Sequence, residues 1–136
     1  MSSQPTQEAP ISILVAEDEE MVRDLLCLHL RERGYEVHEA CDGAQALEIA
    51  QAVLPSLVIL DITMPKMNGW EVARRLRRAK GTAGIKLLMV SGIGPEVLDA
   101  GLPVLGGDVG LDKPFQLEEL EEAMDGLLHP SLPSGR

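Results

Sequence analysis

The sequence is poor in aromatic residues. Tyr35, Trp70 and Phe115 are the only three and make up 2% of its 136 residues. Because 45% of the residues are nevertheless hydrophobic, the core must be built from aliphatic side chains. A chain of this length suits one domain.

Three further absences narrow the class of protein. No apolar run approaches the ~20 residues that a membrane-spanning helix needs. The opening segment, MSSQPTQEAP, has neither the basic nor the apolar region of a signal peptide. The two cysteines, Cys27 and Cys41, lack the spacing of a metal or redox motif, so we expect reduced thiols that fill space. We therefore expect a cytoplasmic protein with no membrane association.

Basic residues are scarce as well. The sequence has 12 Lys and Arg against 22 Asp and Glu, which gives a net charge of −10. Because contact with phosphates needs a positively charged surface, we expect no nucleic-acid binding from this chain. The basic run 73–80 and the acidic run 117–125 are each either a solvated helix face or a protein-docking surface.

What the sequence contains is a fivefold alternation of short apolar runs with segments of helical spacing. The apolar runs predict strands at 11–16, 35–40, 57–60, 85–90 and, more weakly, 108–112. The helical spacing predicts helices at 19–34, 43–53, 68–80 and 117–127. Between these, Gly101 and Pro103 should limit a helix that starts at Pro95 to about two turns.

This alternation predicts the fold class. Short apolar strands joined by helical crossovers form a parallel sheet that is covered on both faces. We predict a doubly wound α/β fold with five parallel strands, occupying residues 11–128. Residues 1–10 are predicted to form a disordered tail. Residues 129–136 are predicted to form a second tail. Because such sheets bind ligands at the carboxyl ends of their strands, those ends are the place to look for a site.

The predicted strand ends carry polar residues. Residues 17–20 follow the first strand, Asp61 ends the third, Ser91 the fourth, and 112–114 the fifth. Neighbouring carboxylates repel unless a positive charge lies between them, and an oxygen-only cluster in a partly solvated cleft suits Mg²⁺. A divalent cation, the ammonium of Lys113 and a hydroxyl can together stabilise a phosphoryl group on a carboxylate. Aspartate is an established nucleophile for that chemistry.

Each of these residues also has an ordinary structural explanation. Asp18 suits the N-cap of the helix that follows it, and Asp61 suits a turn. Ser91 and Lys113 are both typical of exposed loops. The convergence of four strand ends on one edge is what favours a reactive site.

Four segments carry a resemblance to a known family: VAEDEE, LVILDITMPKMNGWEV, VSG and LDKPF. With the intervals between them, they resemble the receiver domain of two-component response regulators, as in single-domain chemotaxis receivers, over about residues 11–128. The resemblance implies a flavodoxin-like sheet with strand order 2-1-3-4-5. It also implies that Asp61 accepts a phosphoryl group from phosphohistidine. It implies a Mg²⁺ ion bound by Asp18, Asp61 and the backbone carbonyl of Thr63, and through water by Glu17.

The resemblance assigns roles to three more residues and to the partners. Ser91 matches a hydroxyl that turns toward the phosphoryl group, Lys113 a lysine that pairs with a phosphoryl oxygen, and Pro114 a proline that is usually cis. The implied partners are a histidine kinase or histidine phosphotransfer protein, docking beside the helix 19–34, and a downstream protein target. We expect a monomer or weak dimer that catalyses only its own phosphorylation and dephosphorylation and has no DNA-binding domain in cis.

Three departures from the family pattern stand out. Glu17 replaces an aspartate, and we expect Mg²⁺ binding to survive this change. Gly110 stands where the family usually places an aromatic residue that rotates inward with the hydroxyl. The segment 91–110 is poor in helix formers, so we expect a short or mobile helix there that phosphorylation orders or shifts.

Three other functions remain to be weighed. A phosphatase of the haloacid dehalogenase type usually carries a second aspartate two residues after the nucleophile, where this chain has Thr63. A flavodoxin-like cofactor protein would need a phosphate-binding loop after the first strand, where the acidic EDEEM would repel phosphate. A receiver-like scaffold that signals without phosphate stays open, because Gly110 removes the usual aromatic ring.

Overall fold

The parallel sheet lies at the centre of the molecule. In the computed structural model, which describes residues 9–129, its five strands have the order β2-β1-β3-β4-β5. The strands are β1 (Ser12–Ala16), β2 (Glu36–Ala40), β3 (Leu57–Asp61), β4 (Lys86–Ser91) and β5 (Val109–Asp112). The helices are α1 (Glu20–Glu32), α2 (Gly43–Val53), α3 (Gly69–Arg78), α4 (Pro95–Leu105) and α5 (Leu117–Leu128). The predicted fold class and strand order are confirmed.

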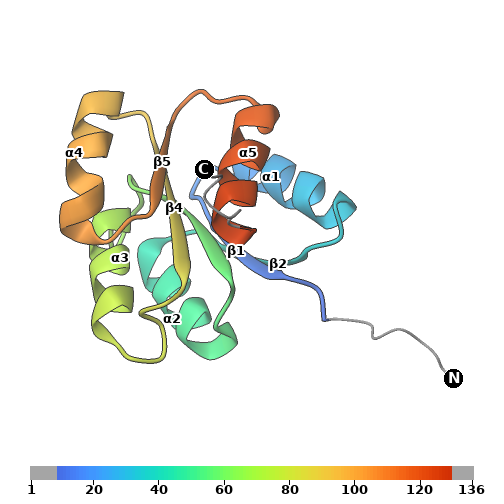
Figure 1. Ribbon diagram of the computed structural model, residues 1–136, viewed down its shortest axis with the longest axis horizontal. Helices are drawn as coiled ribbons and strands as arrows, with labels where there is room; N and C mark the ends of the chain where they lie inside the picture. The colour runs from blue at the N-terminus through green and yellow to red at the C-terminus, as the bar shows by residue number, and fades with distance from the viewer. Residues whose placement is uncertain (1–8, 130–136) are drawn as a thin grey trace, which may run out of the picture.

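The helices form a layer on each face of the sheet. Figure 1 shows α1 and α5 on one side of the strands and α3 and α4 on the other. Two buried clusters follow from this arrangement, one under α1 and α5 and the other under α2, α3 and α4. Most of the two predicted tails lies outside the described residues. No helix within residues 9–129 has the length and apolar character needed to cross a membrane.

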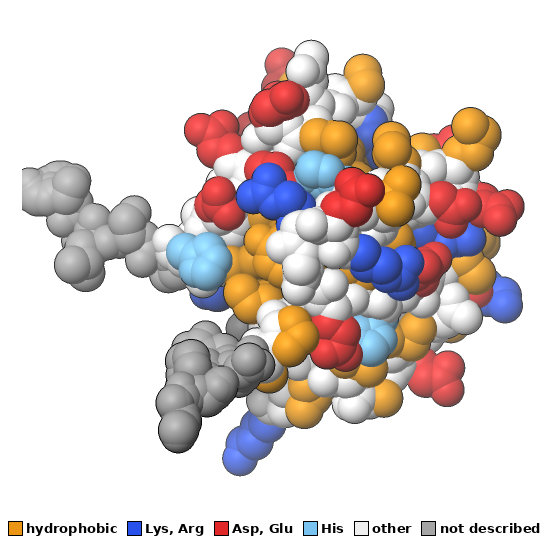
Figure 2. All heavy atoms as spheres, turned by 90° about the vertical axis from the view of Figure 1, so that its right-hand side faces the viewer, with side chains coloured by type: hydrophobic (Ala, Val, Ile, Leu, Met, Phe, Trp, Pro, Cys, Tyr) orange, Lys and Arg blue, Asp and Glu red, His pale blue; other side chains and the backbone are white. Residues whose placement is uncertain are grey.

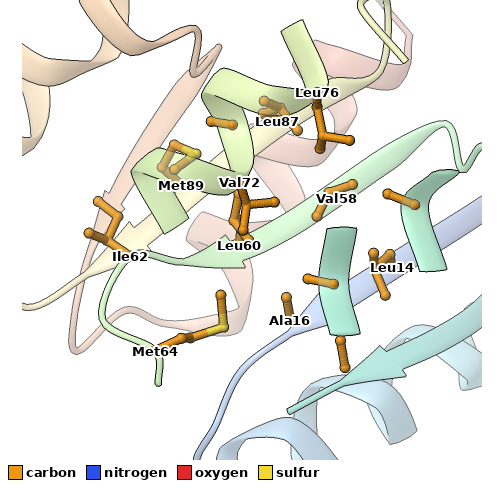
Figure 3. Close-up of a cluster of buried hydrophobic side chains, with 14 of the residues drawn as sticks. Leu14, Ala16, Val58, Leu60, Ile62, Met64, Val72, Leu76, Leu87 and Met89 are labelled. Carbon is orange, nitrogen blue, oxygen red and sulfur yellow. The ribbon is translucent and has the colours of Figure 1, made fainter. Parts of the chain in front are cut away.

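The aliphatic core fixes the position of the central strand. All five residues of β3 are buried, because the strand has neighbours on both sides and a helical layer on each face. Figure 3 shows Leu60 of β3, Met89 of β4 and Val72 of α3 in one buried cluster. Each fully buried aliphatic side chain stabilises the fold by roughly 1.5–3 kcal/mol. The residue that ends β3, Asp61, is therefore carried by a rigid part of the molecule.

The residues predicted to begin and end the helices mostly do so in the structure. The side chain of Asn68 accepts a hydrogen bond from the backbone N–H of Glu71 at 3.0 Å, as expected of the N-cap of α3. Gly34 follows α1 with φ of +94°, a conformation that glycine adopts without strain. Both cysteines are free, but only Cys27 is buried; Cys41 is exposed, so the prediction that it fills space is wrong.

The predicted length of α4 is also wrong. The helix begins at Pro95 as expected but continues for 11 residues, through Gly101 and Pro103. Gly101 lies so close to Trp70 of α3 that an added Cβ would come within 2.7 Å of the indole ring. This close approach accounts for a glycine inside the helix, and the tertiary contact outweighs the weak helix propensity of the segment.

Candidate functional site

Two central strands deliver the acidic residues to one edge of the sheet. In the register of β1 and β3, Ala16 pairs with Leu60, so the chain continues from neighbouring points into Glu17 and Asp61. Asp61 is the last residue of β3 and only 4% of its surface is exposed. Glu17 is 2% exposed, and its N–H donates to the carbonyl of Ala40 at 3.0 Å. The backbone thus forces two carboxylates together in a poorly solvated place.

A third carboxylate completes an acidic cluster. Glu17, Asp18 and Asp61 can each contribute one oxygen to a group whose atoms all lie within 4.8 Å of one another. Glu17 and Asp61 are buried, whereas Asp18 is exposed. Oxygen-only ligation open to water on one side is the donor set that Mg²⁺ prefers. The residues present therefore fit the metal ion that the sequence suggested.

Lys113 supplies positive charge to the cluster. Its Nζ lies 3.0 Å from Glu17 Oε1, 3.5 Å from Asp61 Oδ2 and 3.7 Å from Glu19 Oε1. The backbone N–H of Lys113 donates to the carbonyl of Ser91 at 2.9 Å, which anchors the lysine to the end of β4. The following Lys113–Pro114 peptide bond is cis, as the sequence suggested.

The electrostatics of the cluster favour a proton or a cation on Asp61. Burial, followed by the nearby charge of Glu17, raises the pKa of Asp61 from 3.8 to about 7, although Lys113 opposes this shift. Burial alone would lower the pKa of Lys113, but its hydrogen bond to Glu17 and the charge of Asp61 outweigh burial and raise it. Lys113 therefore stays charged, and it compensates only part of the repulsion between two buried carboxylates.

Ser91 and Thr63 flank Asp61. Ser91 is buried at the end of β4, and its hydroxyl accepts a hydrogen bond from the N–H of Ile93 at 3.1 Å. The hydroxyl is thus engaged with the loop that leads to α4. The N–H of Thr63 donates to Asp61 Oδ1 at 3.2 Å, which holds the carboxylate in place.

Two glycines shape the loop between β3 and α3, and sequence reasoning missed both. The N–H of Gly69 donates to the carbonyl of Ile62 at 2.8 Å, and an added Cβ would come within 2.5 Å of the Asp61 carbonyl oxygen. Gly43, the first residue of α2, lies directly against the carbonyl of Met67 and has no room for a Cβ. A glycine in the first turn of a helix was the only sequence signal of these close approaches.

Arg23 was missed as well. Its guanidinium donates to the backbone carbonyl of Glu17 at 2.9 Å and lies 3.4 Å from Glu39 Oε1. Arg23 therefore steadies the strand end that carries the acidic pair. A basic residue one turn into the helix after an acidic run was the available signal.

Comparison with known proteins gives this geometry a context. Residues 13–125 match the family model described as the response regulator receiver domain. The response regulator MprA of Mycolicibacterium vanbaalenii is 40% identical over 91% of this chain and 53% of its own length. The DNA-binding dual master transcriptional regulator RpaA of Synechocystis is 36% identical over 85% of this chain and 48% of its own length. The chain thus spans about half the length of these relatives.

Solved structures agree with the sequence comparison. The chemotaxis protein CheY4 of Vibrio cholerae superposes with a TM-score of 0.81 at 30% identity, covering 88% of this chain and 100% of its own. The response regulator TrrA of Thermotoga maritima, solved in complex with Mg²⁺ and a beryllium fluoride, gives a TM-score of 0.77 at 35% identity. That match covers 87% of this chain and 99% of the other.

Proposed function

Because this chain belongs to the response regulator receiver-domain family, we propose that Asp61 accepts a phosphoryl group from the phosphohistidine of a histidine kinase or phosphotransfer protein. The observation that carries the proposal is the position of Asp61. It is a buried carboxylate at a strand end, with two further carboxylates and a lysine ammonium around it. An exposed turn aspartate would have none of these neighbours.

The proposed reaction is an in-line transfer. An oxygen of Asp61 attacks phosphorus while the bond from phosphorus to the donor imidazole nitrogen breaks. The bonding pair stays on that nitrogen, and because the other ring nitrogen carries a proton, the products are a neutral histidine and an aspartyl phosphate. The free carboxylate is needed for attack, so the fraction of Asp61 that is protonated, at a pKa of about 7, must first lose its proton to water. Lys113, already 3.5 Å from Asp61, is placed to pair with a phosphoryl oxygen.

The metal site is proposed to use the residues suggested by the sequence. Asp18, Asp61 and the backbone carbonyl of Thr63 would bind Mg²⁺ directly, and Glu17 through water. When bound, the ion would neutralise charge on the phosphoryl oxygens. The hydroxyl of Ser91 is proposed to give up its hydrogen bond with the N–H of Ile93 and to turn toward the phosphoryl group.

A surface on α1 suits the phosphodonor. The side chains of Met21, Leu25 and Leu28 are 84%, 57% and 57% exposed and share one side of the helix. Beside this α1 stripe lies a largely apolar hollow of about 460 Å³, whose lining includes Leu25, Lys113 and Phe115. Figure 2 faces the side of the molecule on which α1 and α5 lie and shows apolar side chains exposed among charged ones. We propose that a helix of the donor protein docks here, next to Lys113.

The output is proposed to be a protein contact of a single-domain, cytoplasmic regulator. Residues 92–129, which include α4, β5 and α5, carry nine carboxylates and one lysine. Such a surface would repel phosphates, which supports a protein target over a nucleic acid for this part of the chain.

A phosphate-independent scaffold is the second candidate, and Gly110 is the observation that favours it. The two candidates separate by covalent labelling. With Mg²⁺ and acetyl phosphate, the parent protein and Asp112→Asn should each gain one phosphoryl group, measured by intact-mass spectrometry. Asp61→Asn should gain none. Equal labelling of Asp61→Asn would refute the assignment of Asp61, and an unlabelled parent would favour the scaffold.

A further inference from the structure

The space above Gly110 is filled by a side chain from another element. Leu98 of α4 is 1% exposed and lies over Gly110 of β5. An added Cβ on Gly110 would come within 2.7 Å of Leu98 Cγ and 2.8 Å of Leu98 Cδ2. Atoms cannot approach so closely, so any larger residue at 110 would force the side chain of Leu98 to shift.

The rest of α4 is held in a similar way. Gly101 lies against the indole of Trp70, and the following loop places Gly107 against Met89 and Leu102. Among the α4 side chains that the structure describes, Leu98 is the fully buried one. Among the side chains that the structure describes, α4 thus meets its neighbours through the buried Leu98, the partly buried Leu102 and the close contact at Gly101. An element with few buried apolar contacts belongs to the less stable part of a fold.

A short connection links Leu98 to the hydroxyl at the reaction site. The N–H of Leu98 donates to the carbonyl of Gly94 at 3.0 Å, and Gly94 precedes the first residue of α4 with φ of +110°. Only residues 92–94 separate α4 from Ser91, whose hydroxyl accepts from the N–H of Ile93. If that hydroxyl turns toward Asp61, the bond to Ile93 is lost and the start of α4 is released.

We infer that Leu98 is the coupling residue of this receiver domain, and that it leaves Gly110 together with α4 when the hydroxyl of Ser91 turns toward Asp61. A helix-borne leucine then performs the task that the resemblance assigns to an aromatic ring on β5. The inference rests on the proposed phosphorylation of Asp61 for its trigger. Its steric part, that Leu98 on Gly110 sets the position of α4, does not.

The steric part is tested without phosphate. Trp70 is the sole tryptophan and contacts α4 at Gly101, so its fluorescence reports where α4 lies. Gly110→Ala should push Leu98 away and shift the Trp70 emission of the unphosphorylated protein. The shift should have the same direction as the one that Mg²⁺ with beryllofluoride produces in the parent. The matched control is Gly126→Ala, because a Cβ at Gly126 meets nothing within 4 Å.

A second substitution separates coupling from misfolding. In the double variant Leu98→Ala/Gly110→Ala the smaller side chain accommodates the new methyl group, so the resting Trp70 emission should return. An unshifted spectrum for Gly110→Ala, or a shift that Leu98→Ala does not reverse, would overturn the inference.

The coupling part is tested with Leu98→Ala alone. This variant should keep full labelling of Asp61 by acetyl phosphate but lose the Trp70 response to Mg²⁺ with beryllofluoride. A full Trp70 response in labelled Leu98→Ala would overturn the coupling role. Failure of the parent to label would instead refute the proposed phosphorylation, and the Gly110→Ala result would still decide the steric part.

Discussion

The edge of the sheet around Asp61 and the segment from Ser91 to Gly110 are built in opposite ways. Asp61 extends from a strand whose five residues are all buried, and hydrogen bonds hold its carboxylate. Among the described side chains of α4, Leu98 alone is fully buried, and Gly101, Gly107 and Gly110 each lie in close contact with a neighbouring side chain. The difference shows where rigidity is needed: proposed chemistry requires fixed atoms, whereas a proposed signal requires an element that can move at low cost.

The largest expected effect is on the rigid side of this comparison. Lys113→Met should slow labelling of Asp61 by acetyl phosphate by about 10²-fold or more, because it removes the ammonium that faces the developing charge. Lys86→Met, at an exposed position of β4, serves as the control and should label normally. Labelling at the parent rate in Lys113→Met would show that the ammonium has no part in the reaction.

The repulsion between Glu17 and Asp61 should make the free energy of unfolding of the parent depend on pH. The pKa of Asp61 is raised in the folded protein, so its contribution to stability is present at low pH and is lost as pH rises through about 7. Without metal, Asp61→Asn should therefore be more stable than the parent at pH 8, by roughly 2–4 kcal/mol, with a smaller difference at pH 5.

Urea unfolding in a chelator at both pH values measures this difference. Asp99→Asn, at an exposed position of α4, is the control and should show no comparable gain. A gain in Asp61→Asn that is equal at pH 5 and pH 8 would mean that ionisation of Asp61 is not its cause.

A substitution away from the carboxylates tests how firmly the loop after β3 is held. Gly43→Ala should displace the carbonyl of Met67 and with it the loop that carries Thr63. We expect Mg²⁺ affinity to fall about tenfold, an effect typical of groups that orient metal ligands. Gly84→Ala, where a Cβ meets nothing within 4 Å, is the control. Unchanged Mg²⁺ affinity in a folded Gly43→Ala would show that the loop adapts.

The smallest expected effect concerns the donor surface on α1. Leu25→Gln should slow phosphotransfer from a histidine kinase about fivefold, equivalent to roughly 1 kcal/mol of lost apolar contact. Labelling by acetyl phosphate should not change, because the small donor does not need the α1 stripe. Equal slowing with both donors would place the defect in the reaction site instead.

Sequence reasoning found the rigid region because its signals are local. A buried strand that ends in Asp61, and a lysine after the last strand, converge on one edge once the sheet is known to be parallel. Sequence reasoning failed to predict the length of α4, because the helix depends on contacts between residues far apart in the chain. Gly101 contacts Trp70, and Leu98 packs on Gly110. The raised pKa of Asp61 could not be predicted from the sequence either, because it depends on burial and on the nearby charge of Glu17.

Phosphorylation of Asp61 is proposed to loosen the contacts that keep α4 in place. Hydrogen exchange of the backbone amides, followed by mass spectrometry with and without Mg²⁺ and beryllofluoride, tests both regions at once. We expect altered exchange in residues 92–105 of the parent, no change in β3, and no response in Asp61→Asn. Equal exchange of residues 92–105 in the parent with and without bound beryllofluoride would show that Asp61 and α4 are not coupled.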